Sequence, residues 1–387
     1  MIMKRGNDTL IYFDNSSTTK PCERAVAAVN KALCEMWGNP SSLHNMGLEA
    51  ERLIKDSRET IAKSLNADEK EIFFTSGATE SNNTAVFSSA FTRGKRRKRI
   101  ITSQTEHPSV LEPIKRLEEQ GFEVIRLLPD SSGAVSPKEV LKYIDKNTLL
   151  VSVMSVNNET GAINDISGIF KAVKAADKDI YTHTDAVQGF LKLPINVKTL
   201  CADMISISAH KVYSPKGVGA LYIKKGSNLK PFIVGGGQEK GFRSGTESVP
   251  LITALGEAVS EYSKTLSERY EKAERLKQRL KKNVEALDGV YLHEFNNHLP
   301  YVNSLTVSGY KSETLLHFLE EREIYVSSGS ACAKGKKSDT LKAFGYSERE
   351  LDSTIRISFC ADNTEDEVDR LVFEIQNAMK SLVRIRR

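Results

Sequence analysis

Cysteine is scarce in this chain of 387 residues, and the few cysteines form no pattern. They are odd in number and without a CxxC pair, and they stand at Cys22, Cys34, Cys201, Cys332 and Cys360. This spacing argues against a disulfide framework and against a zinc site, so we expect free thiols and no metal.

Long apolar runs are missing as well. No stretch approaches the roughly 20 apolar residues that a membrane-spanning helix needs. The opening residues, MIMKRGNDTLIYF, have neither the apolar core nor the small-residue cleavage site of a secretory signal peptide. The sequence therefore predicts a cytoplasmic protein that does not associate with membranes.

An excess of one charge is also lacking. The chain has 55 Lys and Arg against 50 Asp and Glu, a net charge of +5, which is small for this length. The one dense basic block, RGKRRKR at residues 93–99, has no interleaved aromatic residues. We therefore interpret it as a solvated loop before a strand and consider nucleic-acid binding unlikely.

The composition is that of a folded globular protein, with 40% hydrophobic and 27% charged residues. Seven apolar runs bounded by turn residues cover the first two-thirds of the chain, and several are β-branched and nearly continuous, as strands buried on both faces are. These runs are residues 71–75, 98–103, 122–128, 148–156, 179–184, 204–208 and 219–223. Helical patterns, as in residues 108–120, 137–145 and 165–176, lie between them.

This alternation predicts an α/β fold with a mainly parallel seven-stranded sheet and helices on both faces. A long helical stretch at residues 250–287 follows, and then shorter strands alternate with helices. We expect a large domain of residues 18–260. A smaller α+β domain would comprise residues 1–17 and 261–387 and carry Cys332.

Four polar clusters follow predicted strands, where the functional loops of a parallel α/β sheet lie. In TSGATESNN, the helix-start amides and Thr79 suit a phosphate. The segment alone nevertheless favours a helix cap by Thr79 or Ser76, with Glu80 in the first turn. In TEHPSV, His107 is either structural or catalytic. A lone histidine is more often structural, but its place at a strand end makes a catalytic role more plausible than usual.

The other two clusters carry a carboxylate and a lysine. In THTDAVQG, Asp185 either caps a helix or pairs with a ring nitrogen that must stay protonated. In SISAHK, Lys211 follows a buried strand beside Ser208 and His210. Most lysines are solvated, but desolvation at a strand end would lower the pKa of this amine and make it a nucleophile.

The four clusters together meet the needs of one cofactor, pyridoxal 5′-phosphate. It requires a Schiff-base lysine, an acid partner for its ring nitrogen, a phosphate cradle and a flat group over the ring. Lys211 supplies the Schiff-base lysine, Asp185 the acid partner of the ring nitrogen and His107 the flat group over the ring. The phosphate cradle is supplied by Thr79, Ser208 and His210.

Ten motifs in order resemble the cysteine desulfurases, which are class V aminotransferase-type enzymes of fold type I that use pyridoxal phosphate. They run from YFDNSSTT and GNPSSLH through GATESNN, TEHPSV, VNNETG, TDAVQ, SAHK, GGGQEKGFRSGT and SSGSACA to STIRIS. The resemblance covers nearly the whole chain. One motif alone would be weak evidence, but ten in this order form a specific pattern.

The resemblance implies roles for individual residues. Lys211 would bond to the cofactor and move protons, Asp185 would keep the ring nitrogen protonated, and His107 would stack on the ring. The other cofactor contacts that it implies are Asn158, Gln188, Thr79, Ser208, His210 and, from the partner subunit of a homodimer, Thr246. Asn39 and Arg356 would bind the substrate carboxylate, and the guanidinium of Arg356 suits a bidentate pair.

Cys332 lies in SSGSACAKGKKSD, a stretch with the composition of an exposed loop. Its neighbours Lys334, Lys336 and Lys337 should favour the thiolate. By resemblance, this thiolate would take the sulfur of L-cysteine as a persulfide and leave L-alanine. A protein acceptor, in iron–sulfur cluster assembly or thiolation, would then receive the sulfur.

Two alternatives stay open. A selenocysteine lyase or another class V reaction would use the same fold, although aminotransfer needs no thiol at Cys332. A non-enzymatic adaptor would be favoured by loss of Lys211 or Asp185, but both are present.

Some residues depart from the family pattern. The segment that follows Cys332 is slightly shorter and more basic than is usual, so we hypothesise that its lysines recruit an acidic acceptor or stabilise the persulfide. Gln238 stands where histidine is frequent, and its effect is not predicted from the sequence.

Overall fold

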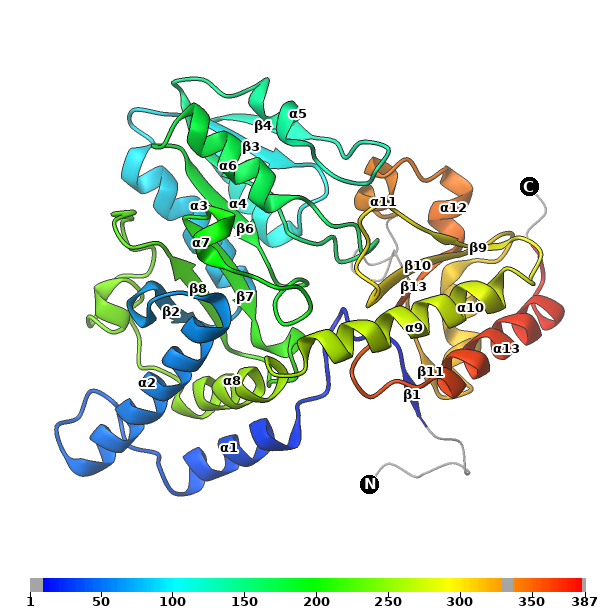
Figure 1. The fold of residues 1–387 in the computed structure, drawn as a ribbon, viewed down its shortest axis with the longest axis horizontal. Helices are drawn as coiled ribbons and strands as arrows, with labels where there is room; N and C mark the ends of the chain where they lie inside the picture. Colours follow the sequence, from blue (N-terminus) through cyan, green and yellow to red (C-terminus); the bar gives the residue numbers. More distant parts are fainter. Residues whose placement is uncertain (1–9, 329–336, 385–387) are drawn as a thin grey trace. The chain divides into compact units, whose positions relative to one another are not determined.

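The computed structural model describes residues 10–328 and 337–384 (Figure 1). The chain divides into two compact units. We call the first the sheet unit; it comprises Thr19–Val156 and Asn164–Leu266. We call the second the C-terminal unit; it comprises Met1–Thr18, Asn157–Ile163 and Ser267–Arg387. The assignment of residues 157–163 to the C-terminal unit was not expected from the sequence.

Seven strands form one sheet in the sheet unit, in the order β2-β8-β7-β6-β5-β3-β4. Only β8 runs antiparallel to its two neighbours, and the other pairs are parallel. The predicted mainly parallel seven-stranded sheet is therefore confirmed. The strands are β2 (Ile72–Thr75), β3 (Arg99–Ser103), β4 (Glu123–Leu127), β5 (Thr148–Ser152), β6 (Tyr181–Asp185), β7 (Met204–Ser208) and β8 (Gly219–Ile223).

Both faces of this sheet are buried, which explains the nearly continuous apolar runs. Ile100 and Ile101 are adjacent on β3 and wholly buried, yet they belong to different hydrophobic cores. Successive strand residues point to opposite faces, so each core covers one face. The helices of the sheet unit are α1 (Glu23–Cys34), α2 (Asn45–Leu65), α3 (Ala78–Arg93), α4 (Pro108–Glu118), α5 (Pro137–Leu141), α6 (Ile166–Ala176), α7 (Val197–Leu200) and α8 (Val249–Tyr262).

The C-terminal unit has an α+β arrangement. Its antiparallel sheet has the order β12-β13-β10-β9, and β1 pairs with β11 in parallel. The strands are β1 (Ile11–Tyr12), β9 (Val290–His293), β10 (Val302–Val307), β11 (Ile324–Tyr325), β12 (Ser327–Ser328) and β13 (Thr354–Ser358). The helices are α9 (Leu266–Val284), α10 (Ser312–Glu320), α11 (Asp339–Ala343), α12 (Glu348–Ser353) and α13 (Glu365–Ser381).

Two helical assignments differ from the sequence analysis. The stretch 250–287 is two helices, α8 and α9, because the chain turns at residues 263–265. Ser263 and Thr265 lie in that turn, and side chains of this kind compete for backbone hydrogen bonds. In addition, α2 was not predicted, although its buried residues recur at intervals of three and four.

Three arginines of the basic run at residues 93–99 contact carboxylates of the protein itself. Arg97 lies 2.7 Å from Asp177, and Arg99 lies 2.9 Å from Glu123. The Arg93 guanidinium stacks 4.5 Å from the centre of the Tyr181 ring. These arginines therefore hold the ends of neighbouring strands and helices together.

Among the residues that the structure describes, no helix has the length and apolar character needed to cross a membrane.

Helices α2 and α8 pack closely because residue 256 has no side chain. A Cβ atom added at Gly256 would lie 2.6 Å from Ser57 Oγ and 2.9 Å from Ser57 Cα. The second atom belongs to the backbone, so a rotamer change of Ser57 cannot relieve the clash. Replacing Gly256 would force the two helices apart.

We expect Gly256→Ala to lower the free energy of unfolding by about 1–3 kcal/mol, as overpacking does. Urea unfolding followed by circular dichroism measures this change. Ser260→Ala on the same helix adds no atoms and serves as the control. Equal stability of the two variants would contradict the close packing described here.

Candidate functional site

The four predicted clusters follow β2, β3, β6 and β7. These strands run in one direction, so their carboxyl ends share one edge of the sheet, where ligands bind in α/β proteins. Asp185 ends β6 and Ser208 ends β7. The candidate residues of the sheet unit therefore gather at one edge.

Asp185 is buried, with 4% of its surface exposed. Its Oδ2 accepts a hydrogen bond from Asn82 Nδ2 at 2.7 Å, and its Oδ1 accepts one from the Val187 N–H at 2.9 Å. No helix begins directly after it, so the helix-cap interpretation is wrong. The carboxylate is held where it can pair with a cationic or N–H group of a ligand.

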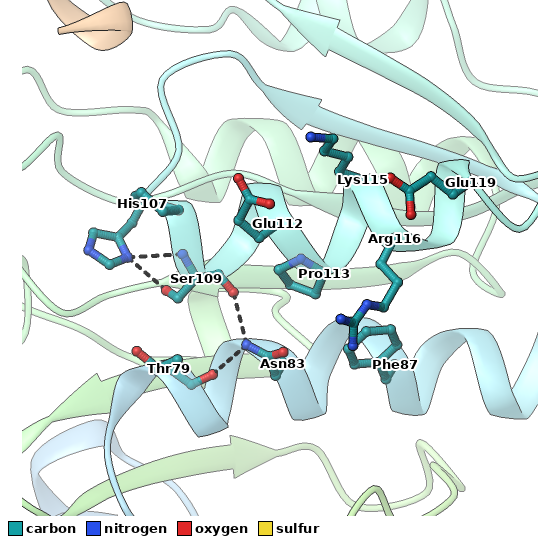
Figure 2. A pocket seen from close by; sticks show the side chains of 11 residues that line it. Thr79, Asn83, Phe87, His107, Ser109, Glu112, Pro113, Lys115, Arg116 and Glu119 are labelled. Atoms are coloured by element: carbon teal, nitrogen blue, oxygen red, sulfur yellow. Dashed lines mark hydrogen bonds between the residues drawn. The ribbon is translucent and has the colours of Figure 1, made fainter. Parts of the chain in front are cut away.

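His107 is the N-cap of α4, and its ring accepts a hydrogen bond at Nδ1 from the Ser109 N–H at 3.1 Å (Figure 2). The proton of the neutral ring is therefore on Nε2. Burial lowers the pKa of His107, the Lys211 charge lowers it further, and Asp185 opposes both effects. The imidazole is a neutral, flat group at pH 7.

Asn82 and Ser109 connect these two residues, and sequence analysis did not single out either of them. Asn82 Nδ2 also donates to Ser109 Oγ at 2.8 Å, and Ser109 Oγ lies 2.8 Å from His107 Nδ1. The network thus runs from β6 through α3 to α4. Polar residues on the buried face of α3, where an apolar stripe is ordinary, could have indicated it.

The N-terminus of α3 has no side-chain cap. Its N-cap is Gly77, with φ 152° and ψ 178°, a conformation that favours glycine. The predicted cap by Thr79 or Ser76 is therefore wrong. A Cβ on Gly219 of β8 would lie 2.8 Å from Gly77 Cα. The two glycines therefore allow β8 to pack closely against the start of α3. The amides of the first turn, beside Thr79, suit an anion.

The turn that carries His210 and Lys211 follows β7 as a single 3₁₀ turn, Ala209–Lys211. Thr19 fixes it: the Thr19 N–H donates to the His210 carbonyl at 2.8 Å, and Thr19 Oγ1 accepts from the Tyr213 N–H at 2.7 Å. Ser208 before the turn is buried.

Burial lowers the pKa of His210 to about 4, and the nearby Lys211 and Lys216 charges act in the same direction. His210 is therefore neutral at pH 7. It can donate a hydrogen bond without adding a charge of its own.

Gln188 is buried in the turn after β6, and its Oε1 accepts a hydrogen bond from Lys192 Nζ at 3.1 Å. Asn39 and Thr246 are exposed in loops of the sheet unit. Asn39 Oδ1 accepts from the Ser41 N–H within its own turn.

The loop before Thr246 is tied down by side chains. Gln238 Oε1 accepts from the Gly245 N–H at 2.9 Å, which gives this residue a structural role. The buried Glu239 pairs with Arg58 at 2.7 Å, and Arg243 pairs with Glu80 at 2.7 Å. The loop therefore presents Thr246 from a fixed base.

Asn158 and Arg356 belong to the C-terminal unit, and the structure brings them together. Arg356 is buried on β13, and its Nη1 donates to the Asn158 carbonyl at 3.0 Å. Its Nη2 donates to Asp14 Oδ1 at 2.8 Å and to Ser17 Oγ at 2.6 Å. Arg356 Nε makes no hydrogen bond within the described residues.

Cys332, Lys334 and Lys336 lie outside the described residues. Lys337 is described, and its Nζ lies 2.8 Å from Glu348 Oε2 and 3.1 Å from Asp352 Oδ2. Its charge is therefore neutralised within the C-terminal unit. The hypothesis that the lysines after Cys332 recruit an acidic acceptor or stabilise the persulfide stays a prediction.

A cavity of about 520 Å³ adjoins two of the candidate residues (Figure 2). Thr79 and His107 line it, together with the facing side chains of α3 and α4. Ligand-sized space is thus present beside both residues. Within residues 10–328 and 337–384, no group of His, Cys, Asp and Glu side chains could hold a metal ion.

Comparison with known proteins gives a consistent result. The family model described as aminotransferase class-V matches residues 11–371. The cysteine desulfurase IscS of Vibrio atlanticus is 39% identical over 381 residues, which cover 96% of this chain and 93% of the relative.

Solved structures agree with the sequence comparison. A structure described as a NifS-like protein superimposes with a TM-score of 0.92 and 38% identity, over 97% of this chain and 100% of that chain. A structure described as SspA in complex with cysteine has a TM-score of 0.79 and 37% identity, over 91% of this chain and 99% of that chain.

Glu106 is a buried carboxyl group beside the site that sequence analysis did not single out. It is 1% exposed, and its Oε1 accepts from the Met154 N–H at 2.7 Å, while Oε2 has no hydrogen-bond partner in the described part of the chain. Burial raises its pKa well above the usual range, and the Asp185 charge adds to this effect. Folding therefore favours the protonated form of Glu106.

We expect Glu106→Gln to become more stable than wild type as the pH rises. Well below the ordinary carboxyl pKa of about 4.3, the side chain is protonated in both states. Above it, the unfolded chain ionises while the folded protein does not, so the wild type loses about 1.4 kcal/mol per unit of pKa difference. Glutamine does not titrate and keeps an oxygen that can accept from Met154.

Urea unfolding at several pH values from about 5 to 8 measures this difference. Glu112→Gln removes an exposed carboxylate from α4 and is the matched control. A stability difference between Glu106→Gln and wild type that does not change with pH would contradict the protonated state.

Proposed function

The chain belongs to the aminotransferase class-V family, and from this premise we propose that it is a cysteine desulfurase that uses pyridoxal 5′-phosphate. The observation that carries the proposal is the network from the buried Asp185 through Asn82 and Ser109 to His107. It places a carboxylate and a neutral, flat ring at the sheet edge where Lys211 also lies. This arrangement suits an aromatic cofactor with a basic ring nitrogen.

The residues of the sheet unit fit pyridoxal phosphate. Asp185 would accept a hydrogen bond from the protonated ring nitrogen, and His107 would cover the ring. The uncapped start of α3, with Thr79, Ser208 and the neutral His210, would hold the phosphate through N–H and O–H donors. When bound, the cofactor supplies an electron sink that weakens bonds to the amino acid's Cα.

Lys211 would anchor the cofactor and shuttle a proton at the substrate Cα. Its neighbours support this role: the turn that carries it is fixed by Thr19, and His210 beside it is neutral at pH 7. A fixed amine close to the reacting carbon needs little reorganisation during proton transfer.

Cys332 would act as the nucleophile. Its thiolate would attack the sulfur of L-cysteine, so that a new S–S bond forms, the substrate C–S bond breaks, and the electron pair stays with the carbon fragment. Protonation of that fragment gives L-alanine. Two similar proteins, one named cysteine desulfurase and one solved in complex with cysteine, support this substrate.

Arg356 and Asn39 would bind the substrate carboxylate. The buried guanidinium of Arg356 is oriented by Asn158, Asp14 and Ser17 and keeps Nε as a further donor. A positioned guanidinium is well suited to a carboxylate.

A homodimer is part of the proposal, with Thr246 reaching the partner subunit's phosphate site. Thr246 is exposed at the end of a loop that ion pairs hold in place. The sheet unit also exposes Trp37 and Leu43, at 68% and 95% of their surfaces. Apolar exposure of this kind is common where a second subunit binds.

We expect Cys332→Ala to lower the formation of alanine from L-cysteine by at least about 10³-fold, because the sulfur loses its acceptor. Chromatography of alanine, with a reductant present, measures this. Cys34→Ala, an exposed cysteine, is the control and should retain activity. Equal alanine from both variants would show that sulfur leaves without Cys332, and no alanine from wild type would contradict the proposed activity.

Delivery of sulfur should depend on the lysines near Cys332. Replacing Lys334 and Lys336 with Ala should slow persulfide transfer to the anionic thiol mercaptosuccinate by about 10-fold at low salt, and less at high salt. Neutral 2-mercaptoethanol controls for reactivity, and Lys337→Ala should have no effect because Glu348 and Asp352 already neutralise Lys337. Equal slowing with both thiols would remove the electrostatic explanation.

A further inference from the structure

Lys192 is a buried lysine that the mechanism described so far does not use. Only 4% of its surface is exposed, whereas lysine is almost never fully buried unless its ammonium is paired. It lies in the turn after β6, seven residues beyond Asp185. Burying an ammonium group is unfavourable unless its donors are satisfied, so the contacts that hold Lys192 are informative.

The backbone of the turn that carries Lys192 is tight and strained. Leu191 has φ 55°, a left-handed conformation that is unfavourable for a bulky residue. Gly189 closes the turn, since its carbonyl accepts from the Lys192 N–H at 3.0 Å and a Cβ there would lie 2.8 Å from Ser155 Oγ. Backbone strain of this kind is concentrated at functional sites.

Lys192 fixes the orientation of one amide. Its Nζ lies 3.1 Å from Gln188 Oε1. An ammonium group has three donors and no acceptor, so it can face only the oxygen of the amide. The NH₂ group of the buried Gln188 is thereby directed away from Lys192.

The Lys192 charge also reaches the rest of the site. It is one of the charges that lower the pKa of His210, after burial and the charges of Lys211, Lys216 and His107. The other titratable groups at this edge are Asp185 on β6 and Glu106 before α4.

We propose that Lys192 is a positioning residue that aims the Gln188 amide at the phenolic oxygen of the cofactor and stabilises that oxygen as an anion. The inference rests on the proposed use of pyridoxal phosphate. The phenolic oxygen is the cofactor's acceptor outside the phosphate, and its negative charge matches a directed N–H donor backed by a buried cation.

The test is an absorbance titration of the holoenzyme against pH. A nearby cation favours the phenolate form, so Lys192→Met should raise the midpoint at which the cofactor's visible band changes, by about one pH unit. Lys192→Arg keeps the charge and should restore the wild-type midpoint. Lys198→Met removes an exposed lysine six residues away and should leave the midpoint unchanged.

A double-variant comparison separates positioning from general stability. In a Gln188→Leu background, Lys192→Met should shift the midpoint by less than in wild type, because its partner is already lost. If Lys192→Met does not fold, Lys192→Gln removes the charge but keeps a donor, and it should show the same raised midpoint.

The outcomes distinguish this inference from the proposed function. A wild-type protein that binds no pyridoxal phosphate would overturn both. If wild type binds the cofactor and Lys192→Met has the same midpoint, only the role of Lys192 is overturned. Where Lys192→Met does not fold, an unchanged midpoint in Lys192→Gln has the same meaning. Equal shifts with and without Gln188 would overturn the action through that amide.

Discussion

The carboxylate of Asp185 is buried at the end of β6, where the Asn82 amide and the Val187 N–H hold its two oxygens. A buried anion is stable only when donors surround it, and the chain supplies them from a helix and from its own turn. Its charge then acts on its neighbours. It helps to keep Glu106 protonated and opposes the loss of a proton from His107.

The same carboxylate accounts for a buried polar residue in α3 and, through it, for one in α4. Asn82 must reach β6, and Ser109 must reach His107, so small polar side chains occupy positions that would otherwise be apolar. The helix starts without a side-chain cap because its first amides face the site. Stability is given up at this helix start in favour of a binding surface.

The sequence was sufficient to predict the seven strands, because a sheet covered on both faces requires nearly continuous apolar runs. It was also sufficient to predict which polar residues stand at the strand ends. It failed at α2, whose apolar period was present but not noticed, and at Ser76 and Thr79, where the helix start lacks the cap that local chemistry favours. Asn82, Ser109, Glu106 and Lys192 could not be assigned from the sequence alone, since their roles depend on partners that only the tertiary fold brings near.

The antiparallel direction of β8 has a consequence for how the site forms. Because β7 and β8 pair directly, the turn that carries His210 and Lys211 lies in the connection of a hairpin, whose paired ends Ser208 and Gly219 are separated by only ten residues. The contacts of Asp185 with Asn82 span 103 residues of sequence. Short-range pairs form earlier in folding than long-range ones. The Lys211 amine is therefore positioned by a local hairpin. The hydrogen bond between Asn82 and the Asp185 carboxylate forms only when distant parts of the chain have come together.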